Sequence, residues 1–162
     1  LSQGVTTMKK LLAALAVTTA LLAPSLAMAK TVTISGQMAT YQGRAAYFAI
    51  YVTDAAGTFH STLYVGGSNT RYYRDLRTWA RGVASVGRLD GITGASVGSG
   101  RSFSVSVEVA DALIDAGYQI RVDSAVEHGQ VFAATPTIPL AQSSSGQAFT
   151  GTGYIAALTV AM

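Results

Sequence analysis

Cysteine is absent from all 162 residues, so the chain has no disulfide, no thiolate metal ligand and no redox pair of thiols. Histidine is scarce as well: His60 and His128 are far apart and lack the acid-and-histidine spacing of a zinc site. The sequence also has neither a Gly-x-Ser-x-Gly nucleophile elbow nor a phosphate-loop lysine. These absences argue against thiol redox enzymes, hydrolases and nucleotidases, and they leave packing alone to hold the fold together.

The excess of positive charge is confined to the N-terminal 30 residues. Of the eleven basic residues, Lys9, Lys10 and Lys30 lie there, and the chain from Lys30 onward carries nine basic against eight acidic side chains. This near-neutral balance gives no argument for binding to nucleic acid.

The N-terminal segment is predicted to be a signal peptide. Met8-Lys9-Lys10 is a short basic start, residues 11–22 are apolar, and Ala27-Met28-Ala29 has the small-x-small pattern that signal peptidase accepts. A bilayer span needs about 20 apolar residues, so the run is too short for a comfortable membrane anchor. We therefore expect residues 1–29 to be upstream residues and a cleaved signal peptide, and residues 30–162 to be a single periplasmic domain.

Most of the remaining sequence alternates apolar and polar residues with a period of two, which predicts half-buried strands. Residues 45–52 are apolar at nearly every position, as in a central strand covered on both faces. Asp54-Ala55-Ala56-Gly57 then predicts a hairpin turn into residues 58–65. Alternating segments lie at residues 31–38, 102–109, 118–123 and 154–160. The pattern predicts a mainly β protein, an antiparallel β-sandwich of immunoglobulin-like type.

One helix, at about residues 71–82, interrupts the strand pattern. Its apolar residues recur at helical spacing, which predicts that Trp79 packs over a sheet and that Gly82 ends the helix. The apolar face comprises Tyr72, Leu76, Trp79, Ala80 and Val83. The opposite face carries Arg74, Arg77 and Arg81, which are either a solvated helix face or a binding surface for an anionic group.

The segment after this helix, Asp90 to Gly100, contains four glycines and is predicted to be a loop. Its order Asp-Gly-Ile-Thr-Gly-Ala-Ser resembles the flavinylation motif recognised by the FAD:protein FMN transferase. In proteins with that motif, the last hydroxyl becomes joined to FMN through a phosphoester. The resemblance implies that Ser96 is the acceptor, that Thr93, Gly94 and Ala95 form the recognition core, and that Asp90 is the motif acid. The acceptor is expected on a protruding, unencumbered loop.

A wider resemblance supports the motif. The segments "AAYFAIYVTDAAGTFHSTLYV", "RYYRDLRTWAR", "DGITGAS" and "GYQIRVDSAVEHG" occur in this order and resemble a family of predicted periplasmic proteins of unknown function. The resemblance covers Val32 to Leu140, and such proteins often neighbour PepSY-type membrane proteins and FMN transferase genes. One departure is that serine stands at position 96, where threonine is commoner. The stretch after Leu140 lies outside the resemblance.

Two functions remain open. The first is an exported electron carrier with covalent FMN at Ser96, a substrate of the FMN transferase that exchanges electrons with a membrane redox protein of PepSY type. Tyr72, Tyr73 or Trp79 would then be candidate platforms for the flavin ring. The second is a cofactor-free binding or structural module, for which residues 90–100 are an ordinary loop. An acid-base pair at Glu127 and His128 is a weaker option, because neighbours on a strand point to opposite faces.

Overall fold

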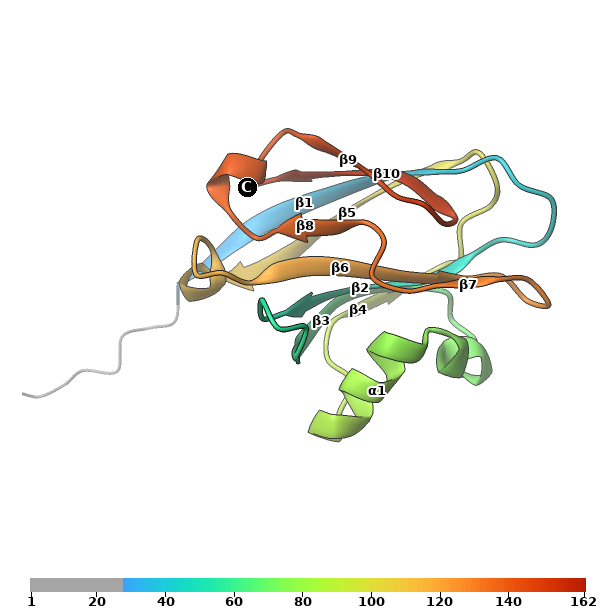
Figure 1. Cartoon of the computed structure of the whole chain (residues 1–162), viewed down its shortest axis with the longest axis horizontal. Coiled ribbons are helices and arrows are strands. Elements are labelled where there is room, and N and C mark those ends of the chain that lie inside the picture. Colours follow the sequence, from blue (N-terminus) through green and yellow to red (C-terminus); the bar gives the residue numbers. More distant parts are fainter. Residues whose placement is uncertain (1–27) are drawn as a thin grey trace, which may run out of the picture.

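The protein forms two packed β-sheets with one α-helix on the outside, as a computed structural model shows for residues 28–162 (Figure 1). Residues 1–27 of the predicted signal peptide lie outside these described residues, and its last residue, Ala29, is the first residue of β1. The strands are β1 (Ala29–Met38), β2 (Tyr47–Thr53), β3 (Phe59–Gly66), β4 (Ile92–Gly94), β5 (Ser102–Ala110), β6 (Gln119–Ala125), β7 (Val131–Phe132), β8 (Thr137–Pro139), β9 (Ala148–Thr150) and β10 (Ile155–Ala161). The helical elements are η1 (Thr70–Asp75), α1 (Arg77–Val86), η2 (Asp111–Leu113) and η3 (Gln142–Ser144). No helix within residues 28–162 is long and apolar enough to cross a membrane.

The two sheets form the predicted β-sandwich. One has the order β5-β1-β10-β9, and the other has the order β4-β3-β2-β6-β7, with β8 also paired to β6. The strand pairs are antiparallel except β3 and β4, which are parallel because the chain crosses over through η1 and α1 between them. This parallel pair departs from the fully antiparallel sandwich that the alternation predicts. The predicted hairpin between β2 and β3 is confirmed, with its turn closed by a bond from Gly57 N–H to the Asp54 carbonyl (3.0 Å).

The main core lies between the sheets and follows the alternation in the sequence. Val32 and Ile34 of β1 are fully buried against Phe48 and Ile50 of β2. The intervening polar residues of β1 face outward, where Ser35 bonds Ser104 of β5. Burial of the apolar set stabilises the sandwich by roughly 25 cal/mol per Å² of apolar surface.

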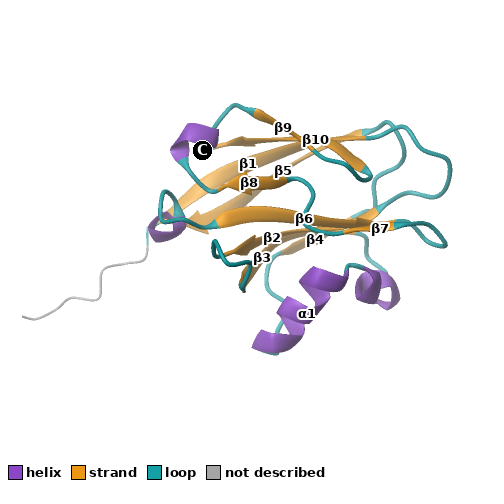
Figure 2. Ribbon diagram, viewed as in Figure 1, coloured by secondary structure: helices purple, strands orange, loops and turns teal. Residues whose placement is uncertain are grey.

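The helix covers the outer face of the six-stranded sheet, so β2 is buried on both faces as predicted (Figure 2). Ala49 and Tyr51 point away from the main core and form a second apolar cluster with Trp79, which is 1% exposed. The indole N–H donates to the Thr62 hydroxyl (2.9 Å), which satisfies its only polar group. The prediction that Trp79 packs over a sheet is therefore confirmed.

The helix boundaries differ from the predicted range of 71–82. The backbone of Leu76 is not helical (φ −81°, ψ 67°), and it separates η1 from α1. Gly82 does not end the helix: it is buried, and a side chain there would collide with the ring of Phe59. The end comes at Gly87, whose left-handed backbone (φ 72°) suits a helix C-terminus.

Asp123 of β6 is a fully buried carboxylate between the sheet and α1. It accepts hydrogen bonds from the backbone N–H of Trp79 (2.8 Å), the hydroxyl of Tyr51 (2.8 Å) and the backbone N–H of Ala134 (3.0 Å). Because Trp79 is the third residue of α1, Asp123 supplies the negative charge that the first turn of the helix lacks. Burial is the main cause that raises the pKa of the Tyr51 phenol, and the nearby carboxylate of Asp123 raises it further. The alternation placed Asp123 on a polar outer face, which was wrong because α1 covers that face.

Candidate functional site

The segment Asp90–Ser96 lies at the edge of the six-stranded sheet. Residues 92–94 form β4, paired in parallel with Tyr64, Val65 and Gly66 of β3. The carboxylate of Asp90 accepts a hydrogen bond from the backbone N–H of Thr62 (3.2 Å), which ties the start of the segment to β3. The motif acid therefore has a structural partner in the protein.

Two glycines of the segment sit where no side chain fits. Gly91 has φ 97°, and a Cβ there would lie 2.7 Å from the carbonyl oxygen of Thr62. Gly94 packs so closely against the hydroxyl of Tyr64 that a Cβ would collide with it. Both positions are thus explained by the approach of β4 to β3, whatever else the segment does.

Replacing Gly94 with alanine tests this packing. We expect the free energy of unfolding to fall by about 1 to 3 kcal/mol, the usual cost of overpacking, because β4 or the Tyr64 ring must move. In the double variant Gly94→Ala with Tyr64→Phe, the hydroxyl is gone but the ring Cζ still lies 2.9 Å from the new Cβ, so part of that loss should be recovered. Urea denaturation of both variants and of Tyr64→Phe alone is the measurement. If Gly94→Ala lowered the free energy of unfolding by the same amount in the wild-type and in the Tyr64→Phe background, the packing explanation would be contradicted.

Ser96 is half-buried and lies between two backbone anchors. Before it, the carbonyl of Gly94 accepts from Gly67 N–H (2.7 Å), and after it, Val97 forms a bridge with Ala46 through bonds of 2.8 and 3.2 Å. Within residues 28–162, no other group forms a hydrogen bond with the Ser96 hydroxyl, whereas Ser99 is bonded to Tyr41 N–H. The segment is thus an anchored strand end rather than the freely protruding loop expected, but its hydroxyl is not engaged.

Gly67, whose N–H donates to the Gly94 carbonyl, is contacted by Tyr47 and Tyr73. The ring of Tyr47 packs directly on Gly67 and lies 5.1 Å from the ring of Tyr72, and Tyr73 donates its hydroxyl proton to the Gly67 carbonyl (2.8 Å). Tyr47 and Tyr72 are half-buried, so part of each ring remains accessible. Trp79 is too deeply buried to offer a ring face to a ligand, which removes it from the candidate platforms.

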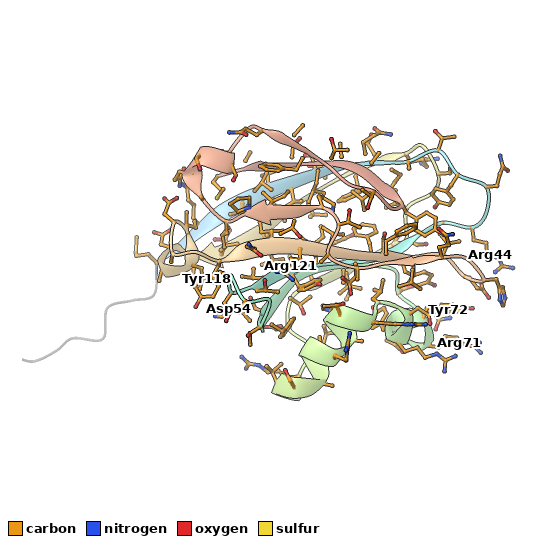
Figure 3. All side chains as sticks on the ribbon, viewed as in Figure 1. Arg44, Asp54, Arg71, Tyr72, Tyr118 and Arg121 are labelled. Atoms are coloured by element: carbon orange, nitrogen blue, oxygen red, sulfur yellow. The ribbon has the colours of Figure 1, made fainter. Side chains whose placement is uncertain are left out.

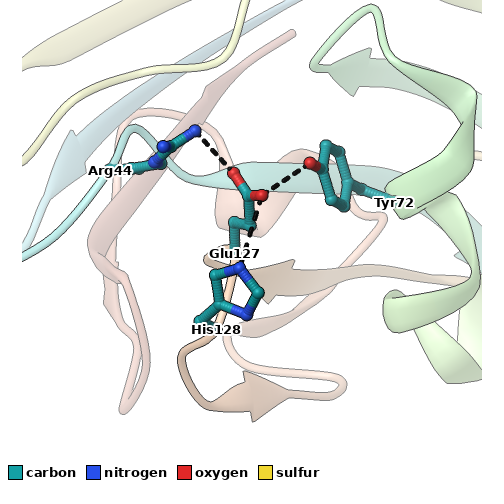
Figure 4. A network of polar contacts seen from close by, with 4 residues as sticks. All are labelled: Arg44, Tyr72, Glu127 and His128. Carbon is teal, nitrogen blue, oxygen red and sulfur yellow. Dashed lines mark hydrogen bonds and ion pairs between the residues drawn. The ribbon is translucent and has the colours of Figure 1, made fainter.

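Glu127, in the turn after β6, contacts the loop between β1 and β2 and the helical element η1 at this end of the molecule, where Figure 3 labels Arg44, Arg71 and Tyr72. The hydroxyl of Tyr72 donates to Oε1 (2.7 Å), Arg44 donates to Oε2 (2.8 Å), and His128 Nε2 lies 3.6 Å from Oε1 (Figure 4). The sequence Glu127-His128-Gly129 is typical of a polar turn at a strand end, and His128 does lie in a turn with φ 60°. The opposite orientation of strand neighbours therefore does not apply to Glu127 and His128. The sequence does not predict the partners of Glu127, because Arg44 and Tyr72 are 83 and 55 residues away along the chain.

These contacts favour the ionised form of Glu127. The hydrogen bond from Tyr72, and then the positive charge of Arg44, hold its pKa below the ordinary value. The same hydrogen bond raises the pKa of the Tyr72 phenol. A carboxylate with a lowered pKa is a poor general acid at neutral pH, which argues against Glu127 and His128 as a catalytic acid-base pair. No group of three metal-ligating side chains occurs among residues 28–162.

We expect Tyr72→Phe to raise the pKa of Glu127, and Arg44→Gln to raise it by a smaller amount. Because folding lowers this pKa, the stabilisation by Glu127 is present above the unfolded value of about 4.3 and is lost as the pH falls through the folded value. Carboxyl-carbon NMR titration measures the shift. The control is Tyr73→Phe, whose hydroxyl bonds Gly67 instead. An unchanged Glu127 pKa in Tyr72→Phe would show that the bond is not maintained in solution.

Comparison with known proteins identifies a family match over most of the sandwich, from β1 to the start of β10. A family model described as "Predicted periplasmic protein (DUF2271)" matches residues 29–157. The match extends beyond Leu140, where the resemblance inferred from the sequence ends, through η3 and β9 into β10. The C-terminal strands therefore belong to the family fold. Neither a curated protein nor a solved structure matches the chain.

Proposed function

Because the chain belongs to this family of predicted periplasmic proteins, we propose that it is an exported electron carrier with FMN attached through its phosphate to Ser96. The observation that carries the proposal is the Ser96 hydroxyl: it ends an Asp-Gly-Ile-Thr-Gly-Ala-Ser segment, is half-exposed and bonds to no other group in residues 28–162. The family description supports the compartment only. The flavin and its attachment rest on the motif.

The attachment reaction is a phosphoryl transfer without any redox change. The Ser96 oxygen attacks the FMN phosphorus of FAD, the bond from that phosphorus to the bridging oxygen breaks, and AMP leaves with that oxygen. The Ser96 proton passes to a base of the FAD:protein FMN transferase. FMN supplies one- and two-electron transfer once it is bound.

The residues around the segment fit an attached flavin. Ser96 holds the phosphate, and the half-exposed rings of Tyr47 and Tyr72 are the available aromatic surfaces beside Gly67. Arg71, whose guanidinium carbon lies 5.6 Å from the centre of the Tyr72 ring, is exposed and can pair with an anionic group. Electrons would pass between this end of the protein and a membrane redox protein of PepSY type.

A cofactor-free binding or structural module is the alternative function. It is favoured by the packing of Gly91 and Gly94, since both glycines have a structural reason that is independent of a transferase. In that case residues 90–96 are a covered sheet edge that presents neighbouring loops to a partner.

Co-expression with an FAD:protein FMN transferase in a flavin-replete host separates the two functions. The carrier is expected to gain the mass of one FMN less one water, and its yellow fluorescence should stay with the polypeptide after denaturation. The matched control is the same expression without the transferase, which should give an unmodified and colourless chain. An unmodified protein in both cultures would favour the cofactor-free module.

A further inference from the structure

Positive charge is concentrated in the segment from η1 to the turn after α1. Residues 70–88 carry five arginines and one acid, Asp75, whereas the other described residues carry four basic and seven acidic side chains. Within residues 28–162, the ion pairs are those of Glu127 with Arg44 and His128, so these five arginines have no acidic partner there. Residues 28–162 carry nearly balanced charge, nine basic against eight acidic side chains, but most of the positive charge lies in residues 70–88.

Three of these arginines line an open groove on the outer face of the helix. Arg74, Arg77 and Arg81 surround a volume of about 600 Å³ whose remaining lining is the small side chains of Ala80 and Ala84. All three arginines are exposed. The groove lies on the exposed side of η1 and α1, whereas Trp79 of α1 is buried against the sheet.

The placement of these charges opposes the stability of the helix. Arg77 is the first residue of α1, at the positive end of the helix dipole, and Arg81 lies one turn later as a like charge. The first turn contains no acidic residue of its own to offset them. The buried carboxylate of Asp123 offsets the helix terminus itself, because it accepts from Trp79 N–H, but it forms no ion pair with these arginines. The unpaired arginine side chains therefore leave positive potential on this outer surface, which favours an anionic ligand.

The shape and the neighbours of the groove identify the kind of anion. Its floor has only alanines, and the large apolar side chains that are exposed in residues 28–162 are Met28, Val86, Leu89 and Ile92, none of which lines it. A lipid surface is usually bound by basic residues together with inserted apolar ones, which this face lacks. Guanidinium groups spaced from the end of η1 along the first turns of α1 match carboxylates spaced along a protein surface.

We infer that the groove formed by Arg74, Arg77 and Arg81 is a docking surface for a partner protein that presents a cluster of carboxylates. This inference does not depend on the flavin at Ser96. Electrostatic complementarity of this kind speeds encounter and selects the partner, and it weakens as salt is added.

The test uses a short synthetic oligoglutamate peptide as the probe, at low and at physiological salt. In the isotope-labelled protein, the amide NMR shifts caused by the peptide should map to residues 74–84. Changing all three groove arginines to glutamine should weaken binding by about tenfold or more. The thermal midpoint should stay the same or rise, because unfavourable charges leave the helix N-terminus.

The matched control changes Lys30, Arg88 and Arg101 to glutamine, which lowers the net charge equally and leaves the groove intact. Its affinity for the peptide should fall by less than about twofold. Equal losses in both triple variants, or no saturable binding by the wild type, would overturn the inference. Inorganic phosphate that binds the groove as tightly as the peptide would make it a small-anion site. Tighter binding of phosphatidylglycerol vesicles through the same arginines would make it a lipid-binding surface.

Discussion

Ser96→Ala is expected to remain folded and to carry no covalent flavin after co-expression with the FMN transferase. Alanine has no hydroxyl to attack the phosphorus of FAD, so the loss should be complete rather than partial. Because the Ser96 hydroxyl bonds no other group in residues 28–162, its removal should change the free energy of unfolding by no more than about 0.5 kcal/mol. Intact mass and denaturant titration of the same sample check both parts.

Two neighbouring substitutions define the specificity of this result. Ser99→Ala keeps the acceptor and should keep the adduct, although it removes a hydrogen bond from Tyr41 N–H and so costs about 1 kcal/mol of stability. Ser96→Thr preserves a hydroxyl and should also be modified. A flavin adduct that persists in Ser96→Ala would place the attachment elsewhere and refute the proposed site.

Asp123→Ala should destabilise the protein by about 3 kcal/mol or more, a large part of the 5 to 15 kcal/mol that is usual for a whole domain. The change leaves the Tyr51 hydroxyl and the N–H groups of Trp79 and Ala134 without their acceptor, at about 1 to 3 kcal/mol for each buried donor. It also removes the negative charge at the start of α1. Urea denaturation followed by Trp79 fluorescence reports the loss directly at the site.

A graded series separates the role of the carboxylate from a general effect of substitution. Asp123→Asn keeps the shape and one acceptor, so its loss should be intermediate, and Tyr51→Phe removes one donor at about 1 kcal/mol. The exposed Asp111 serves as the control, and its replacement by alanine should cost no more than about 0.5 kcal/mol. If Asp123→Ala lost no more than Asp111→Ala, the buried network would not exist in solution.

The sequence predicts those parts of the fold that depend on near neighbours. Alternation in residues 31–38 and the Asp54–Gly57 turn are local signals, and the corresponding strands and hairpin are confirmed. Trp79 is also predicted correctly, because helical spacing alone places it beside Leu76 on the buried face. The helix start is misplaced, since the tight turn of η1 follows the same apolar spacing as an α-helix until Leu76.

What the sequence does not predict depends on contacts between distant segments. Asp123 looks like a surface residue until α1 is known to cover β6, and the partners of Glu127 come from the loop between β1 and β2 and from η1. The strand β4 has only three residues and pairs through a crossover, so no periodicity can reveal it. The resemblance of residues 90–96 to a flavinylation motif comes from the sequence alone, whereas the anchors at Gly94 and Val97 come only from the structure.

The parallel pairing of β4 has a consequence for hydrogen exchange. Its ladder joins three residue pairs to β3, and Ile92 is already half-exposed, so detaching it breaks few bonds and uncovers little apolar surface. Opening of residues 90–96 should therefore cost a small fraction of the global unfolding free energy, while Trp79 and Asp123 keep α1 in place. If Ser96 is the acceptor, as we propose, a modifying enzyme would receive it on a briefly released strand, with the sandwich beneath it still folded.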